Sequence, residues 1–120
     1  MHVARIGTVP KIPFVTPLFT GEEVTQQALL ADEGRGYSVR VINFGKGVRN
    51  KFHVHDTDQI LVVTAGEGYV ATEEHKQRVT VGDVIVFAAG EKHWHGATED
   101  SCFSHIYIRP KSGNTTQLEG

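Results

Sequence analysis

The sequence predicts a single all-β domain, and two observations carry this prediction. Short apolar runs rich in β-branched residues recur along the chain, at residues 37–42, 59–64, 83–87 and 103–108. Glycines are frequent and stand between these runs, where they favour turns. Short strands with turn signals at such spacing are typical of a β-sandwich or β-barrel. No segment shows a convincing amphipathic helical period.

The two ends of the chain lack the pattern of central strands. Three prolines among residues 1–20 predict an extended arm or an edge there. Residues 22–31 contain helix-forming side chains, yet they also alternate as a strand does, and we predict a strand. The polar residues 112–120 are expected to be frayed. No linker or low-complexity segment interrupts the chain, so we predict one domain over residues 1–120.

The composition narrows the classes of partner and compartment. The formal net charge is −2, with acidic and basic residues interspersed, and we expect neither nucleic acid nor a membrane as a partner. The one cysteine, Cys102, excludes an internal disulfide and fits a reducing compartment. Neither a signal-peptide pattern nor a run of roughly 18 apolar residues is present. A cytoplasmic protein is therefore expected.

Seven histidines in 120 residues are the unusual feature of the composition. His53 and His55 are separated by one residue, so in a strand both imidazoles lie on the same face. Gln59 opens the next apolar run, and His93 directly follows the turn at residues 88–92. If a closed sheet brings these segments together, three imidazole nitrogens and one amide oxygen make a plausible set of ligands for a divalent metal. From the residues alone, a role as surface or satisfied core histidines also stays open, as does the choice of metal.

The spacing of these residues resembles the two motifs of the cupin family. The first motif, G-x5-H-x-H-x3/4-E-x6-G, corresponds to residues 47–66, and the second, G-x5-P-x-G-x2-H-x3-N, to residues 82–97. The matching positions are Gly47, His53, His55, Gln59 and Gly66, and then Gly82, Ala88, Gly90, His93 and Ala97. The resemblance covers roughly residues 40–108 and implies a cupin jelly-roll, or double-stranded β-helix, barrel.

Gln59, Ala88 and Ala97 depart from the family pattern, which has glutamate, proline and asparagine there. The glutamine version, with Gly-Glu-Lys-His-Trp-His-Gly-Ala at 90–97, resembles the manganese-dependent cupin hydroxynitrile lyases and many small single-domain cupins. This implies one divalent ion on three histidines and a glutamine, with manganese favoured over zinc, iron, nickel or copper, and often a homodimer. A neutral glutamine leaves the full double charge on the ion, which favours anion binding and Lewis-acid chemistry.

Two further histidines are candidates for proton transfer. Strand alternation directs His95 to the same interior as His93, and His105 stands in the last apolar run. In the resemblance, both match positions beside the metal of the lyase group. A nearby dication favours a neutral imidazole, which is a suitable general base. We predict that His105 takes a substrate hydroxyl proton while His95 assists or orients; the alternative is a pair of polar core residues.

A substrate pocket is expected on the same interior face. An arginine that faces it would bind an anionic substrate group, whereas one at a strand end is often solvated or paired outside. Trp94 alternates with its histidine neighbours and either lines the pocket or faces outward. The predicted pocket residues are Arg40, Ile42, Phe44, Leu61, Tyr107 and Arg109.

Three functions remain compatible with these residues, each with a small molecule as the partner. The first is an enzyme of the hydroxynitrile-lyase type, acting by Lewis-acid and general-base chemistry on a small hydroxy or carbonyl compound. The second is a metal-dependent cupin dioxygenase of the quercetinase type. The third is a non-catalytic barrel that binds a metal or a small ligand. The fold alone does not separate them.

Overall fold

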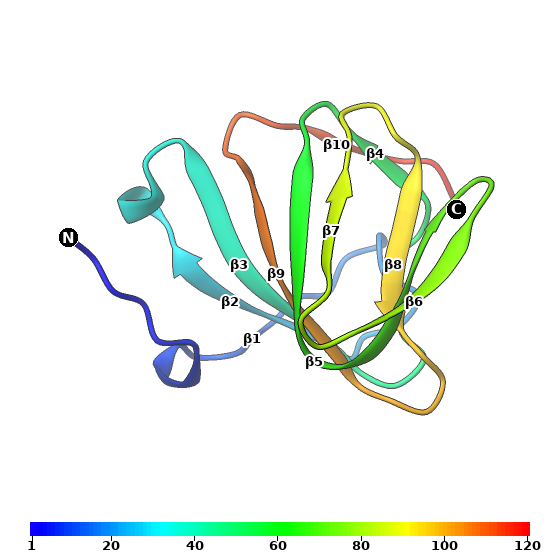
Figure 1. The fold of residues 1–120 in the computed structure, drawn as a ribbon, viewed down its shortest axis with the longest axis horizontal. Coiled ribbons are helices and arrows are strands. Elements are labelled where there is room, and N and C mark those ends of the chain that lie inside the picture. The colour runs from blue at the N-terminus through cyan, green and yellow to red at the C-terminus, as the bar shows by residue number, and fades with distance from the viewer.

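The computed structural model describes residues 1–120 and shows one curled antiparallel sheet (Figure 1). Its elements are η1 (Ile6–Thr8), β1 (Ile12–Pro13), β2 (Val24–Leu30), η2 (Asp32–Gly34), β3 (Tyr37–Phe44), β4 (His53–His55), β5 (Gln59–Thr72), β6 (Lys76–Thr80), β7 (Val84–Phe87), β8 (His93–Ala97), β9 (Phe103–Pro110) and β10 (Thr115–Gln117). The two η elements are single 3₁₀ turns. The all-β prediction is therefore confirmed, and the strand predicted in residues 22–31 is β2.

The curl of the sheet depends on the long strand β5. Neighbouring strands follow the order β1-β2-β3-β9-β5-β8-β4-β10, and β6 and β7 also pair with β5. Up to Gly66, β5 pairs with β7 and β9, and beyond Gly66 it pairs with β6 and β8. Gly66 has a φ of 71°, and a Cβ atom there would collide with the carbonyl oxygen of Cys102. Glycine is thus required where β5 passes from one face of the fold to the other.

The core lies on the concave side of the sheet, because alternate residues of each strand point inward. Phe44 and Phe103 are almost fully buried there. The ring centroid of Phe44 lies 5.9 Å from that of His95 and 5.8 Å from that of His105. The apolar core therefore continues directly into the group of buried histidines. The whole core cluster consists of Phe19, Val24, Ile42, Phe44, Val48, Val63, Val79, Ala97 and Phe103.

The N-terminal arm lies along an edge, as the prolines predict. Strand β1 pairs with the outer side of β2. The side-chain amide of Gln27 donates to the carbonyl oxygens of Ile6 and Val9, both at 2.9 Å. Phe19, at the end of the arm, packs edge-on against Phe44 in the core. These contacts hold the arm against the sheet.

The prediction that residues 112–120 are frayed is wrong. Strand β10 pairs with β4, the strand that carries His53 and His55. The Glu119 carboxylate accepts hydrogen bonds from the Arg49 guanidinium, the shorter at 2.8 Å, and from the Phe52 amide. Order here comes from main-chain pairing and one ion pair, and neither depends on apolar side chains. The polar composition of residues 112–120 therefore does not indicate that this segment is ordered.

None of the helical segments has the length or the apolar character needed to cross a membrane. The homodimer implied by the family resemblance stays a prediction, which the mass of the protein in solution would test.

Candidate metal centre

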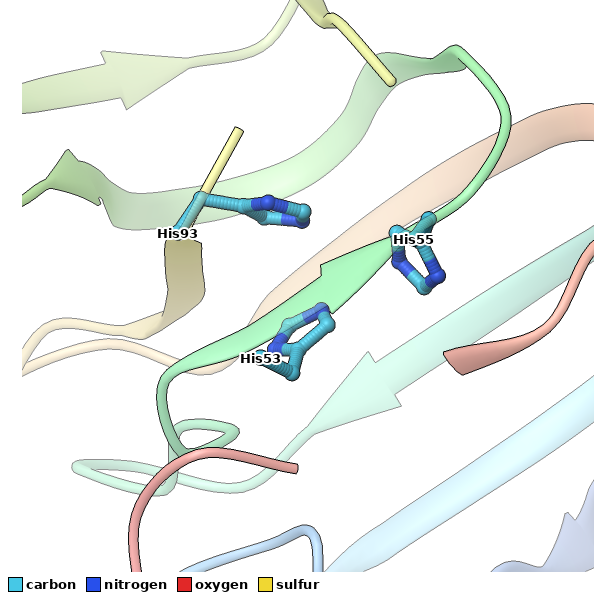
Figure 2. A group of neighbouring side chains, drawn as sticks. All are labelled: His53, His55 and His93. Atoms are coloured by element: carbon cyan, nitrogen blue, oxygen red, sulfur yellow. The ribbon is translucent and has the colours of Figure 1, made fainter. Parts of the chain in front are cut away.

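Three histidines from two strands that are distant in sequence converge inside the sheet. His53 and His55 point inward from β4, and His93 points toward them from β8, as Figure 2 shows. All three are buried, and one potential ligand nitrogen from each lies within 4.8 Å of the other two. His53 is paired with His93 across β4 and β8, and their ring centroids are 4.3 Å apart. The alternation of β4 and the closure of the sheet thus place three imidazoles around one point.

Hydrogen bonds on the outer side of these rings free the nitrogens that face the centre. His53 Nδ1 lies 2.6 Å from the Lys51 carbonyl oxygen, and His93 Nδ1 lies 2.8 Å from that of Glu91. A carbonyl oxygen only accepts, so each Nδ1 carries the proton and each Nε2 keeps its lone pair. Histidine ligands of metal ions are oriented in this way.

Several buried polar atoms around this point have no hydrogen-bond partner. They include the Nε2 atoms of His55 and His93 and the Oε1 atom of Gln59, the first residue of β5. Buried polar atoms without partners are costly in a folded protein. A divalent cation would satisfy all three at once, since imidazole nitrogen and amide oxygen are ordinary ligands. The residues present therefore fit a bound divalent ion.

His55 is held by the C-terminal segment. Its Nδ1 lies 2.8 Å from the hydroxyl oxygen of Thr115 in β10, and that oxygen also accepts a hydrogen bond of 3.0 Å from Arg109. Arg109 Nη1 itself lies 3.1 Å from His55 Nδ1. A free lone pair on His55 Nε2 requires a proton on Nδ1, and the Thr115 hydroxyl is the neighbour that can accept it. The Arg109 guanidinium only donates, so its contact with Nδ1 favours the opposite tautomer. The shorter contact, to Thr115, is the one that supports the metal-binding tautomer.

Replacing Thr115 with valine is expected to weaken metal binding by about 10- to 100-fold, because the orienting hydrogen bond to His55 is lost. Chelator competition measures this affinity. Thr116→Val is the matched control, since Thr116 is the next residue of the same strand, points to the opposite face and does not line the cavity. Equal metal affinity for Thr115→Val and the wild type would remove Thr115 from the site.

His95 and His105 lie beside the cluster, with their ring centroids 4.8 Å apart. The Asn50 Oδ1 atom accepts a hydrogen bond from the His95 amide at 2.8 Å, which fixes the orientation of the Asn50 side chain. Its Nδ2 atom therefore donates to His95 Nε2, 3.2 Å away. The proton of His95 consequently lies on Nδ1, which has no partner. Both ring nitrogens of His105 are also without partners.

Burial keeps these imidazoles neutral. It is the main cause that lowers the pKa of His53 to about 4, of His55 to about 3 and of His105 to about 4. Burial lowers the pKa of His93 as well, and it lowers that of His95 strongly. A neutral imidazole is the form that binds metal or accepts a proton.

The stability of the metal-free protein is expected to fall as the pH is lowered from 6.5 to 4. An unfolded His105 titrates near 6.5 and the folded one near 4, so the unfolded state binds more protons between these values. The contribution of His105 is complete above pH 6.5, and about 3 kcal/mol of it is lost by pH 4. Urea unfolding with chelator present, at pH 7 and pH 4, measures the change.

His105→Gln should show a smaller loss of stability on acidification than the wild type. His75→Gln, at the exposed turn between β5 and β6, is the control. An identical pH dependence in His105→Gln and the wild type would contradict the assignment.

A cavity of about 660 Å³ opens beside the cluster. His53, His55, Gln59, His95 and His105 all line it. Of the predicted pocket residues, those on the cavity wall are Arg40, Ile42, Phe44, Tyr107 and Arg109.

Two residues considered for the pocket lie elsewhere. Leu61 is fully buried and does not line the cavity, although it points inward from β5 as Gln59 does. The Trp94 ring lies under the guanidinium of Arg49, with Cζ 4.6 Å from the ring centroid. Trp94 is thus on the opposite side of β8 from His93 and His95, as strand alternation requires.

The sequence model of the cupin domain matches residues 40–107, more than half of the chain. The chain belongs to the cupin family. Among curated relatives of this cupin, the (R)-mandelonitrile lyase of Granulicella tundricola is 30% identical over 112 residues, which cover 92% of the chain and 86% of the lyase.

Solved structures show the same fold. A cupin-like protein from Thermotoga maritima superposes with a TM-score of 0.85 at 28% identity, covering 94% of this chain and 89% of that one. The polyketide cyclase RemF from Streptomyces resistomycificus superposes with a TM-score of 0.86, covering 98% and 85%. Its identity is 15%, so it shows likeness of fold alone. Together these matches confirm the cupin jelly-roll prediction.

Sequence reasoning missed two residues of the site, Asn50 and Thr115. Asn50 lies within the interval between Gly47 and His53, where no motif position marks it. Thr115 lies in a polar tail whose pairing with β4 the sequence does not indicate. A hydrogen-bonding side chain that acts on another side chain across the fold leaves no periodic signal.

Proposed function

We propose that this cupin is a metal-dependent lyase of the hydroxynitrile-lyase type, acting on a small hydroxy or carbonyl compound. In this proposal His53, His55, Gln59 and His93 hold one divalent ion, manganese in preference to zinc, iron, nickel or copper. His105 is the general base. The observation that carries the proposal is the position of His105. Its side chain is fully buried and has no hydrogen-bond partner, and it lies on the wall of the cavity that adjoins His53 and His55.

The two histidines beside the cluster differ in what they offer a substrate. In His95, the nitrogen that can accept a proton is already bonded to Asn50, so the ring presents an N–H donor. In His105 neither nitrogen is engaged, so a lone pair is available. His105 is therefore the base, and His95 is the donor that orients substrate or stabilises developing negative charge.

A divalent ion held by four neutral donors keeps its double charge and, when bound, supplies Lewis-acid stabilisation of negative charge. For a cyanohydrin, His105 takes the hydroxyl proton, and the carbon–cyanide bond breaks with its electron pair leaving on cyanide. The carbonyl compound forms in the same step. His105 then passes the proton to cyanide, which departs as hydrogen cyanide. Burial lowers the pKa of His105 to about 4, which keeps the ring neutral before the reaction, makes it a weak base, and favours return of the proton to cyanide.

Replacing Gln59 with glutamate is expected to tighten metal binding and to slow turnover. A carboxylate neutralises one unit of the charge on the ion, which is then held more firmly and attracts substrate negative charge less. We expect each effect to be about tenfold, measured by chelator competition and by kcat. Gln59→Ala is the comparison, because it removes a ligand without adding charge and should weaken metal binding. Unchanged metal affinity and kcat in Gln59→Glu would show that residue 59 is not a ligand.

Metal-loaded protein assayed with mandelonitrile tests the proposed reaction. We expect release of benzaldehyde and cyanide that chelator abolishes and manganese restores. Oxygen uptake with a flavonol or catechol, without cyanide release, would overturn the proposal in favour of a dioxygenase. Tight ligand binding without turnover of any substrate would overturn it in favour of a binding protein.

A further inference from the structure

Two arginines stand on the cavity wall without a carboxylate partner. Arg40 lies in β3 and Arg109 in β9, and both are partly buried. Neither takes part in an ion pair. Arg40 donates to the amide oxygen of Gln26 at 2.7 Å, and Arg109 donates to the Thr115 hydroxyl at 3.0 Å. The hydrogen-bond partners of both charges are thus neutral. Backbone hydrogen bonding is the main cause that lowers the pKa of Asp56, the acid whose pKa the charge of Arg109 also helps to lower, and Asp56 does not line the cavity.

The register of the sheet places the two arginines together. Arg40 is paired with Tyr107 across β3 and β9, and Tyr107 and Arg109 point to the same face of β9. Arg40 and Arg109 are therefore diagonal neighbours, a spacing of about 7–8 Å between Cα atoms that long side chains bridge. Arg109 also lies over the Tyr107 ring, with Cζ 5.6 Å from the centroid.

The charge of the cavity wall is unbalanced. Apart from histidines, its charged residues are Asp32, Arg40, Arg109 and Lys111. The ammonium of Lys111 lies 3.7 Å from the Asp32 carboxylate, so this acid is already compensated. Two guanidinium groups remain, on the same cavity wall as His105. Paired arginines are suited to a carboxylate, which accepts hydrogen bonds in a forked geometry.

We propose that Arg40 and Arg109 together bind a carboxylate of the substrate, so that the natural substrate is a small carboxylic acid with a hydroxyl or carbonyl group. The placement of that second group at His105 rests on the proposed function. The carboxylate lies between the guanidinium groups near Tyr107, and the reacting carbon lies deeper in the cavity. Residues 105, 107 and 109 of β9 thus present a base, an aromatic ring and an anion site in succession.

Calorimetric binding of mandelate and of mandelamide to the metal-loaded protein tests this assignment. The two probes share ring and hydroxyl, and only mandelate carries a charge. We expect the wild type to bind mandelate about tenfold to a hundredfold more tightly. Arg40→Gln and Arg109→Gln should each remove most of this preference while changing mandelamide binding little. Arg78→Gln is the matched control, because Arg78 is exposed on β6 and pairs with Glu67 away from the cavity.

Metal content is measured for each variant, because Arg109 also contacts Thr115 and His55. If Arg109→Gln loses metal, Arg40→Gln alone decides the result. Equal binding of the two probes by the wild type would overturn the proposal. So would a preference for mandelate that survives in Arg40→Gln. The lyase proposal is judged separately, by cyanide release from mandelonitrile, and it stands if cyanide is released even when the arginine proposal fails. Conversely, arginine-dependent binding of mandelate without any lyase activity would support the anion site and refute the lyase.

Discussion

Replacing His105 with glutamine is expected to lower kcat by about 10²- to 10⁴-fold while the metal content stays unchanged. Glutamine keeps a polar side chain in the buried position but has no nitrogen that can accept a proton. The loss should therefore appear in the chemical step. Steady-state kinetics with metal analysis of the same sample measures both quantities.

His95→Gln is the informative comparison for His105→Gln. The glutamine amide still donates a hydrogen bond, as the His95 Nδ1–H does, so a smaller loss of kcat is expected. Full turnover by His105→Gln would remove His105 as the base. A larger loss of kcat in His95→Gln than in His105→Gln, with the metal retained, would make His95 the general base and His105 the hydrogen-bond donor.

Replacing His93 with alanine is expected to empty the metal site and to reduce activity to background. His93 contributes the one imidazole that reaches the centre from β8, and the two remaining imidazoles both come from β4. Two imidazoles and an amide oxygen hold a divalent ion poorly at neutral pH. Metal analysis after gel filtration should show one ion per chain in the wild type and almost none in His93→Ala.

His75→Ala controls for the loss of any histidine, because His75 lies at an exposed turn away from the cluster. It should retain the wild-type metal content. His93→Ala protein that keeps a full complement of metal would show that the ion binds elsewhere.

The sequence predicted the parts of the site that follow from strand alternation. His53 and His55 share a face because they are two residues apart in a strand, and the same holds for His93 and His95. The convergence of β4 with β8 depends on pairing between distant strands, and only the family spacing of glycines and histidines indicated it. Gly66 shows the physical reason for that spacing, since β5 changes partners at a backbone conformation that glycine adopts.

The contacts that residues outside the two cupin motifs make with the site could not be predicted from the sequence. The order of the C-terminal segment depends on main-chain bonds to β4 and on the pair formed by Glu119 and Arg49. The tautomer of His95 depends on the amide of Asn50, which lies 45 residues away in sequence. Composition and periodicity report burial of side chains, and these contacts involve single polar groups brought together by the fold. Leu61 was predicted to line the pocket, but it is buried away from the cavity. Strand alternation predicts on which face of the sheet a side chain lies, and it does not predict whether that side chain reaches the cavity.

An anomalous-scattering map from crystals of the manganese-loaded protein tests the proposed metal site most directly. We expect a single strong peak about 2.0–2.3 Å from the Nε2 atoms of His53, His55 and His93, with the Gln59 amide oxygen at a similar distance. A map without a peak between these three rings, or with its peak at another site, would contradict the proposed metal site.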